Sequence, residues 1–410
     1  MIKKLLFSAA VFASLSPIAS AQTKLATSIW RGALKTTSGN EIPFNFEVSG
    51  NGKQQLTVIN STEHLQVPNV TGSGDSVFVK MPLFDSEFRL KQTGQTLSGQ
   101  FIKHLGARDA AMEFTAMATT PYRFFKDGEK PAFDVSGRWS AIFGEGADQD
   151  TTVAEFKQSG SKVTGTFLTT TGDYRFLEGT VAGNRLYLSC FDGGHAFLFT
   201  AKISDDKTLS EGKFFSGLTG KDVWTAVRNK NAKLPDAYSL AALKPGYKKL
   251  AFSFKDITGK TVSLDDERFK NKVVIIQIMG SWCPNCMDET AYMVNYYKKF
   301  HKKGVEVVGL AYERTTDFAK SQKTVAQIKD RFNIPYPLLI TGYTSNKVET
   351  AKSLPMLTKV VGFPTTIIID KSGDVRKIHT GFSGPGTGHY YTEFISEFEQ
   401  LTEDLLAEKI

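Results

Sequence analysis

The sequence has few cysteines and histidines for its length, with three and six among 410 residues. A structural zinc site needs four ligands, but only one Cys-x-x-Cys pair is present, and His301, His379 and His389 lie scattered along the chain. Dense basic runs are also lacking, because lysines occur in pairs at most, as at Lys248-Lys249. The net charge of +8 therefore predicts a mildly basic surface. We expect neither a bound metal nor a nucleic-acid partner.

Long hydrophobic runs are scarce, and nothing after the first residues approaches the length of a membrane span. Lys3 and Lys4 precede an apolar stretch from Leu5 to Leu15, and Ala19-Ser20-Ala21 has the small-residue pattern of a signal-peptide cleavage site. The apolar stretch is too short to span a bilayer, which takes about 20 residues. We therefore predict a signal peptide at 1–21, cleaved after Ala21, and no transmembrane segment in the mature chain. An exported protein of this kind is periplasmic in a bacterium.

Strand patterns fill the first half of the chain, without a convincing helical stretch. Apolar and polar residues alternate in short runs such as Phe44–Val48, with glycines between the runs. This half repeats itself: Trp30 recurs as Trp139, and Leu97-Ser98-Gly99 recurs as Leu209-Ser210-Glu211-Gly212, with one residue added. The repeat predicts β unit 1 at 22–120 and β unit 2 at 131–228, each a small antiparallel barrel or sandwich.

A different pattern begins after a polar, proline-bearing linker predicted at 229–247. Residues Lys272–Met279 form a hydrophobic run typical of a strand buried on both faces. The following residues Cys286–Lys303 have an apolar face and predict a helix. Because strands and helices alternate in this half, it predicts an α/β domain with a central sheet at 248–410.

Two cysteines lie at the junction between that strand and that helix, in the motif Cys283-Pro284-Asn285-Cys286. A cysteine at a helix N-terminus has a lowered pKa, because free N–H groups and the helix dipole stabilise its thiolate. Pro284 suits the first helical position, where a missing N–H costs nothing. The spacing puts both sulfurs on one helix face, so Cys286 can attack a mixed disulfide formed at Cys283. We expect Cys283 to be the exposed, acidic thiol and Cys286 the buried one.

Two motifs together resemble those of a known family. The motif Trp282-Cys283-Pro284-Asn285-Cys286, followed by Gly362-Phe363-Pro364-Thr365-Thr366, resembles the thioredoxin-like thiol:disulfide oxidoreductases of the TlpA/ResA type over roughly residues 247–410. The resemblance implies a thioredoxin fold, a redox disulfide between Cys283 and Cys286, and a cis Phe363–Pro364 bond. It also implies a substrate-binding role for five residues: Trp282, Pro284, Gly362, Phe363 and Pro364.

The resemblance also implies a proton acceptor for the second cysteine. Thioredoxin keeps a buried Asp six residues before its first cysteine, and Gln277 stands at that position here. TlpA/ResA-like members instead place a Glu just after the next strand, which Glu313 matches. Glu313 is therefore the predicted base for Cys286. The third cysteine, Cys190, is interpreted as a small core residue, with a regulatory thiol as the alternative.

These observations predict an exported enzyme that reduces protein disulfides through Cys283 and Cys286, with no metal or organic cofactor. Its partners would be a disulfide-containing protein substrate and a membrane electron donor that recharges the dithiol. Two alternatives stay open. The β module could be the main functional part of a ligand-binding, client-binding or chaperone-type protein, or the same fold could catalyse thiol peroxidase chemistry.

Overall fold

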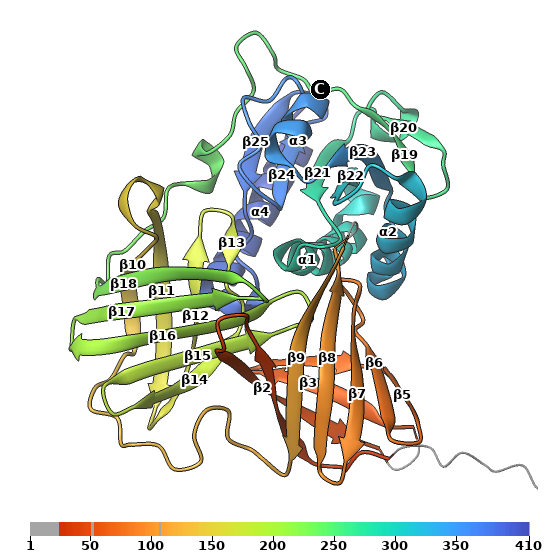
Figure 1. Cartoon of the computed structure of the whole chain (residues 1–410). Coiled ribbons are helices and arrows are strands. Elements are labelled where there is room, and N and C mark those ends of the chain that lie inside the picture. The colour runs from red at the N-terminus through yellow and green to blue at the C-terminus, as the bar shows by residue number, and fades with distance from the viewer. Residues whose placement is uncertain (1–23, 51–52, 106–107, 410) are drawn as a thin grey trace, which may run out of the picture.

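The computed structural model describes residues 24–50, 53–105 and 108–409, so the predicted signal peptide lies outside the described residues. Three sheets build the molecule, two of nine strands and one of seven. Figure 1 shows the two nine-stranded sheets side by side, with the seven-stranded sheet and its helices above them in this view. The described part of the chain contains no helix that is both long and apolar enough to cross a membrane.

The first sheet is antiparallel and lies within the first predicted repeat. Its order is β4-β3-β2-β1-β9-β8-β7-β6-β5. The strands are β1 (Ile29–Lys35), β2 (Glu41–Ser49), β3 (Gln55–Asn60), β4 (Glu63–Val67), β5 (Asn69–Ser73), β6 (Ser76–Lys80), β7 (Ser86–Thr93), β8 (Thr96–His104) and β9 (Asp109–Ala118). Its two end strands follow one another along the chain, separated by Pro68.

The second sheet has the same strand count and a similar order, β11-β10-β18-β17-β16-β15-β14-β12-β13. Strand β11 also pairs with β12, so the sheet curls into a barrel-like ring that leaves β13 outside. The strands are β10 (Gly137–Phe143), β11 (Asp150–Ser159), β12 (Lys162–Thr169), β13 (Gly172–Asp173), β14 (Leu177–Ala182), β15 (Arg185–Phe191), β16 (Ala196–Asp205), β17 (Thr208–Ser216) and β18 (Gly220–Arg228), with a 3₁₀ turn η1 (Gly146–Asp148).

The sequence repeat corresponds to a structural one. Trp30 and Trp139 open β1 and β10, and each indole N–H donates to a carbonyl oxygen four residues earlier, at 2.9 Å. The residue added in the second repeat is accommodated by an irregularity in the β17–β18 pairing between Leu209 and Gly212. Glu211, inside it, has a φ of +50°. The insertion is therefore a β-bulge, which leaves the flanking register intact.

The two β units share a core. Phe191, at the end of β15, belongs to the hydrophobic cluster of the first unit together with Leu198 and Phe215. Its ring stacks on Phe44 at a centroid distance of 4.3 Å and meets Phe101 edge-on at 5.1 Å. The second unit therefore fills part of the interior of the first, and the two β units form one packed body.

The third sheet is mixed, in the order β20-β19-β23-β22-β21-β24-β25, with β21, β22 and β23 parallel. Its strands are β19 (Ser253–Asp256), β20 (Thr261–Ser263), β21 (Val273–Met279), β22 (Val305–Glu313), β23 (Leu338–Thr344), β24 (Thr365–Ile369) and β25 (Val375–Thr380). The helices are α1 (Pro284–Phe300), α2 (Phe318–Phe332), α3 (Lys347–Ser353) and α4 (His389–Ala407), with short turns η3 (Glu267–Phe269), η4 (His301–Lys303) and η5 (Pro385–Thr387). The hydrophobic run predicted as a doubly buried strand is β21, every residue of which is buried.

The segment between the halves packs against its neighbours. Its 3₁₀ turn η2 (Ala237–Ser239) brings Tyr238 edge-on to His379 of β25, at 4.8 Å. Ala232 is buried in a small cluster with Val153 and Leu168 of the second β unit. The polar composition of the segment therefore does not prevent it from bridging the two halves.

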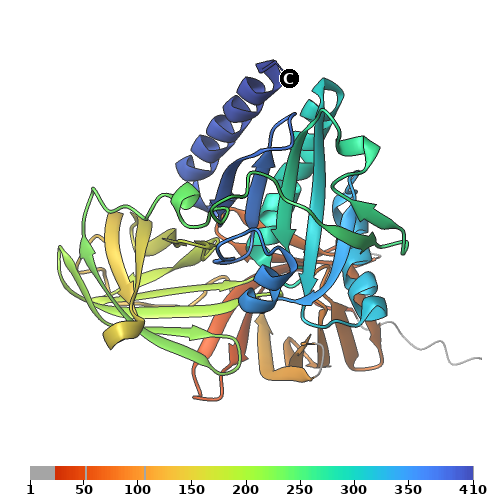
Figure 2. The ribbon, with the colours of Figure 1, turned by 90° about the horizontal axis from the view of Figure 1, so that it is seen from above.

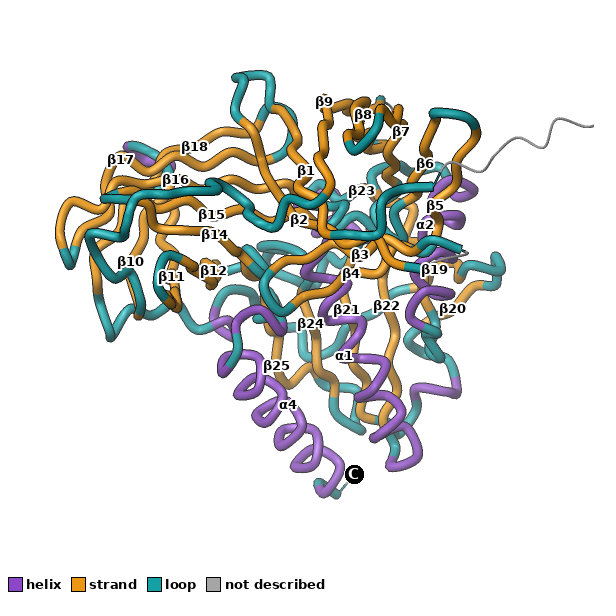
Figure 3. Tube along the Cα trace, turned by 90° about the horizontal axis from the view of Figure 1, so that it is seen from below, coloured by secondary structure: helices purple, strands orange, loops and turns teal. Residues whose placement is uncertain are grey.

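The β module, meaning both β units, contacts the third sheet's domain, which we call the redox domain. Leu83, from the β6–β7 loop, is part of the redox domain's hydrophobic cluster, and Phe84 packs against it. The Gln327 side chain donates to the Pro82 carbonyl at 3.1 Å. The views from above and below agree that the redox domain lies over the junction of the two β units (Figures 2 and 3).

Candidate functional site

Helix α1 places the two cysteines of the motif at its first turn. Cys283 is the N-cap residue, and Pro284 occupies the first helical position as expected. Cys283 and Cys286 form a disulfide with their Cα atoms 5.2 Å apart. The Cys286 N–H donates to Cys283 Sγ at 3.2 Å, one of the helix-terminal donors that stabilise a thiolate there.

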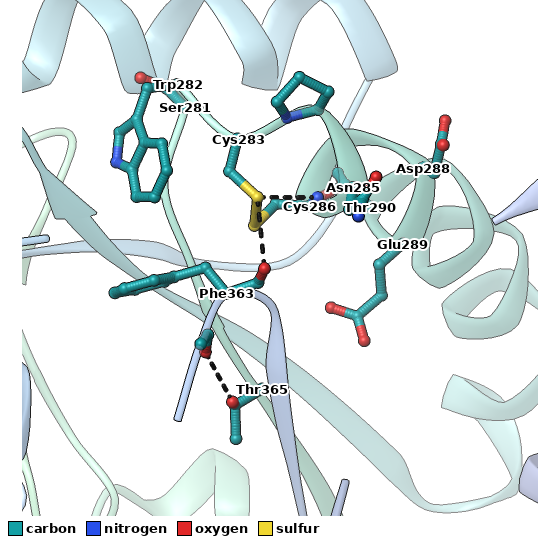
Figure 4. Close-up of a disulfide and its surroundings, with 12 residues drawn as sticks. Ser281, Trp282, Cys283, Asn285, Cys286, Asp288, Glu289, Thr290, Phe363 and Thr365 are labelled. Carbon is teal, nitrogen blue, oxygen red and sulfur yellow. Dashed lines mark hydrogen bonds between the residues drawn. A yellow bond between two sulfur atoms is a disulfide. The ribbon is translucent and has the colours of Figure 1, made fainter. Parts of the chain in front are cut away.

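The loop before β24 faces this disulfide. The Phe363–Pro364 bond is cis, which confirms the prediction. Cys283 Sγ lies 3.7 Å from the Phe363 carbonyl oxygen (Figure 4). The Phe363 ring meets Trp282 edge-on at 5.3 Å, and the Trp282 indole N–H donates to the Tyr312 carbonyl at 2.9 Å. Phe363, of the five residues predicted to bind substrate, therefore lies against Cys283, and Trp282 packs on the Phe363 ring.

Glu313 lies at the end of β22, close to the turn that precedes Cys283. One carboxylate oxygen accepts from the Ser281 N–H at 2.8 Å, and the other accepts from the Ser281 hydroxyl at 2.5 Å. The Thr324 hydroxyl also donates to it, at 3.3 Å. Burial raises the pKa of Glu313, although these hydrogen bonds oppose the shift. In this arrangement Glu313 holds the Ser281 turn in place.

A second buried carboxylate, Glu289, lies one helical turn after Cys286. The Thr366 hydroxyl donates to it at 2.6 Å and the Gln277 amide at 2.7 Å. Strand pairing aligns Gln277 with Thr366, so β21 and β24 together build this polar pocket. Burial raises the pKa of Glu289 to about 7. Figure 4 shows its side chain on the same side of α1 as the disulfide.

A near-neutral pKa suits a group that exchanges protons at physiological pH. The sequence analysis missed Glu289, although a carboxylate three residues after Cys286 on the same helix face could have been noticed. The Gln277 amide that replaces thioredoxin's Asp donates to Glu289 and also lies 3.4 Å from the Cys286 carbonyl. The buried carboxylate of this pocket, Glu289, therefore comes from α1 and not from the β21 position that Gln277 occupies.

Several curated relatives of this chain are thiol-disulfide oxidoreductases. Thiol-disulfide oxidoreductase ResA of Bacillus subtilis (strain 168) is 30% identical over 148 residues, which is 36% of this chain and 74% of the relative. The chain belongs to the thiol-disulfide oxidoreductases of the ResA type. The Redoxin family matches residues 244–392, and Thioredoxin-like protein YneN of the same organism is 30% identical over 130 residues, 32% of this chain and 68% of the relative.

Solved structures of similar proteins cover about two fifths of this chain. A thioredoxin-family thiol:disulfide interchange protein from Chlorobium tepidum TLS is matched over 100% of its chain and 40% of this one, at 22% identity and a TM-score of 0.31. The C-terminal domain of a putative thiol-disulfide oxidoreductase from Bacteroides thetaiotaomicron is matched over 97% of its chain and 39% of this one, at 18% identity and a TM-score of 0.31.

One expectation about the oxidoreductase's cysteines was wrong. Cys283 was expected to be exposed, but its exposed fraction is only 5%, and that of Cys286 is 0%. The position at the N-terminus of α1 is as predicted, and the β module packs on the residue that follows Cys283. Gly194, at the tip of the β15–β16 hairpin, packs against Pro284, and Phe84 lies against the same glycine.

A buried arginine joins the three parts of the molecule beside this site. Arg175 pairs with Glu63 of the first β unit, with Asp192 of the second at 3.0 Å, and with Asp288 of α1. It also donates to the Pro284 carbonyl at 3.3 Å. Removing such a partner leaves buried carboxylates uncompensated, which is strongly unfavourable. No local sequence signal marks Arg175, because its partners lie far from it along the chain.

The third cysteine is remote from this chemistry. Cys190 is buried in the aromatic cluster of the second β unit, and burial raises the pKa of its thiol. A buried thiol with a raised pKa is a poor nucleophile. This environment agrees with its interpretation as a small core residue.

Proposed function

We propose that this oxidoreductase is exported to the periplasm and reduces disulfides of protein substrates there. The observation that supports this most directly is the Cys283–Cys286 disulfide at the start of α1, beside the cis-proline loop. In the reduced enzyme the Cys283 thiolate attacks one sulfur of the substrate disulfide and releases the other as a thiolate. The Cys286 thiolate then attacks Cys283 Sγ, which closes the enzyme disulfide and frees the reduced substrate.

The surrounding residues have separate roles in this proposal. Gly362, Phe363 and Pro364 hold an extended substrate segment by its backbone, while Trp282 and Pro284 border the sulfur. A buried carboxylate accepts the Cys286 proton. Glu313 is the acceptor implied by the family resemblance, but both of its oxygens are engaged by Ser281. The position of Glu289 next to Cys286 along α1 favours Glu289.

The direction of electron flow follows from the compartment and the motif. Strong periplasmic oxidants have potentials near −120 mV, and thioredoxin lies near −270 mV, roughly. The Pro-Asn pair between the cysteines favours the reducing end, so a membrane electron donor must recharge the dithiol. Equilibration with glutathione measures the potential, and a value above roughly −150 mV would show an oxidant.

Insulin reduction tests the assigned chemistry. The reduced wild-type protein and Cys190→Ala should both precipitate insulin chains, whereas Cys283→Ser should not. Peroxide consumption by the wild type, measured in parallel, separates a disulfide reductase from a thiol peroxidase. Cys286→Ser should trap substrate proteins as mixed disulfides, which mass spectrometry identifies. Full insulin reduction by Cys283→Ser would contradict the proposal.

A further inference from the structure

A turn of the second β unit covers the substrate-binding edge of the redox site. The turn consists of residues Thr170 to Asp173, in which Thr170 and Thr171 follow β12 and the last two residues are β13. Its conformation is held locally, because the Thr169 hydroxyl accepts from the Thr171 N–H at 3.2 Å and donates to the Gly172 carbonyl at 3.1 Å. The turn is therefore a built structure with a defined shape.

This turn packs tightly against the redox domain. A Cβ added to Gly362 would lie 2.4 Å from Thr171 Cγ2, and a Cβ added to Gly172 would lie 1.7 Å from Asn285 Nδ2. Real Cβ atoms do not approach other atoms this closely, so a side chain at either glycine would force Thr171 or Asn285 to shift. Thr171 therefore lies directly against the residue that starts the cis-proline loop.

Polar contacts fix the turn at two further points. The Asn285 amide, inside the Cys-x-x-Cys motif, donates to the Asp173 carbonyl at 3.2 Å. The Gly384 N–H donates to the Asp173 carboxylate at 2.8 Å. Two residues later in the chain, Arg175 bonds to Asp288 and to the Pro284 carbonyl. These bonds connect the turn and its neighbour to the start of α1 and to the residue before η5.

The covered state is incompatible with a bound protein substrate. Cys283 is 5% exposed, so a second disulfide cannot reach its sulfur along the line of attack. An extended substrate segment along Gly362 would also overlap Thr171. This argument rests on the proposed function, which assigns Cys283 as the nucleophile and Gly362 to Pro364 as the substrate edge.

We propose that the Thr170–Asp173 turn is a built-in competitor of the substrate, and that a disulfide-bearing protein segment reaches Cys283 only when the β module moves off the redox domain. Thr171 takes the place of the substrate backbone beside Gly362, and Arg175 holds the covered form together. The β module thus determines which disulfides the enzyme reduces, because a substrate must displace the turn in order to bind.

A wedge in the turn tests the proposal in the full-length mature protein. Gly172→Gln places a side chain where Asn285 lies, so it should force the turn away from α1. The matched control is Gly160→Gln, in the β11–β12 turn of the same unit, where the glycine also has a positive φ and its added Cβ meets nothing within 4 Å. Thr171→Trp is a second wedge, in case Gly172→Gln does not fold.

Iodoacetamide labelling of Cys283 in the reduced proteins measures access. Each folded wedge variant should be labelled about tenfold faster than the wild type or more, because labelling is limited by the fraction of open molecules. The limiting rate at high pH should rise without a shift of the midpoint, whereas a changed thiol pKa would move the midpoint. Gly160→Gln should match the wild type. Equal labelling of the wild type and a folded wedge variant overturns the proposal.

Insulin reduction by the same variants separates this proposal from the proposed function. If the turn blocks the substrate and the enzyme reduces disulfides through Cys283, the wedge variants should reduce insulin faster than the wild type. Adding Cys283→Ser should abolish this gain. If a wedge variant is labelled quickly but reduces no disulfide, the proposed function is wrong, whereas the proposal that the turn blocks Cys283 is supported. If the wild type reduces insulin through Cys283 and the wedge variants change neither the labelling rate nor the reduction rate, the proposed function is supported. The proposal that the turn blocks Cys283 is then wrong.

Discussion

At the scale of single residues, Glu289 should make stability depend on pH. Burial raises its pKa to about 7 from a usual value of 4.5, so the folded protein binds this proton more tightly than the unfolded chain. Its contribution to the free energy of unfolding is fully present below pH 4.5 and is lost as the pH rises through about 7. The loss should be on the order of 3 kcal/mol.

Denaturant unfolding of the oxidised protein between pH 5 and 8 measures this loss, and oxidation keeps the two active-site cysteines from titrating. Glu289→Gln keeps one acceptor oxygen in the pocket, for either Thr366 or Gln277, and cannot ionise. The wild type should lose stability relative to this variant as the pH rises. A difference that stays constant over the range would contradict the assignment.

The two buried carboxylates, Glu289 and Glu313, are alternative candidates for the base that accepts the Cys286 proton. Loss of a general base slows a reaction by about 100-fold or more, so the variant of the residue that serves Cys286 should show that loss in disulfide exchange. We expect it for Glu289→Gln. Glu313→Gln should show it instead if the sequence-based assignment holds.

Single-turnover kinetics with a protein disulfide, measured across pH, distinguish the two variants. A residue that only positions the Ser281 turn should lower the rate equally at all pH values. The base should also remove one titration step from the pH profile. Unchanged rates in both variants would exclude both carboxylates.

At the scale of elements, the β15–β16 hairpin joins the two β units through Phe191. Its ring packs among Phe44, Phe88 and Phe101 of the first unit. Phe191→Ala should lower the free energy of unfolding by about 3–5 kcal/mol, the usual cost for a buried phenylalanine. The matched control Phe125→Ala removes a ring that is 44% exposed and should cost much less. Chemical denaturation measures both, and equal losses would show that the shared core is unimportant.

At the scale of the whole molecule, the fragment Lys248–Ile410 separates the redox domain from its cover. The linker composition predicts that this fragment folds alone and reduces a small disulfide. The structure adds that it would lose the contacts of Leu83 and Phe84, so it should melt at a lower temperature than the full chain. It should also be labelled faster at Cys283. An insoluble or inactive fragment would mean that the β module completes the core or the site.

Much of the fold and site could be predicted because the signals are local. Alternation in runs such as Phe44–Val48 predicts strands. The recurrence of Trp30 as Trp139 predicts the repeat, and the two indoles make matching hydrogen bonds. The Cys-x-x-Cys motif after a buried strand placed Cys283 at the N-terminus of α1. In each case neighbours along the chain supply the physical cause, so the pattern can be recognised in the sequence.

The tertiary structure alone decided how the site is used. The spacing of Glu289 from Cys286 is visible in the sequence, but its burial between Gln277 and Thr366 depends on the pairing of β21 with β24. Thr171 and Gly172 belong to a short polar turn like many others, and their contacts lie across the β-module interface, on Gly362 and Asn285. Sequence periodicity reports which face of an element is buried but not which distant turn covers it. The exposure of Cys283 could therefore not be predicted, because it depends on how two separately recognisable halves pack together.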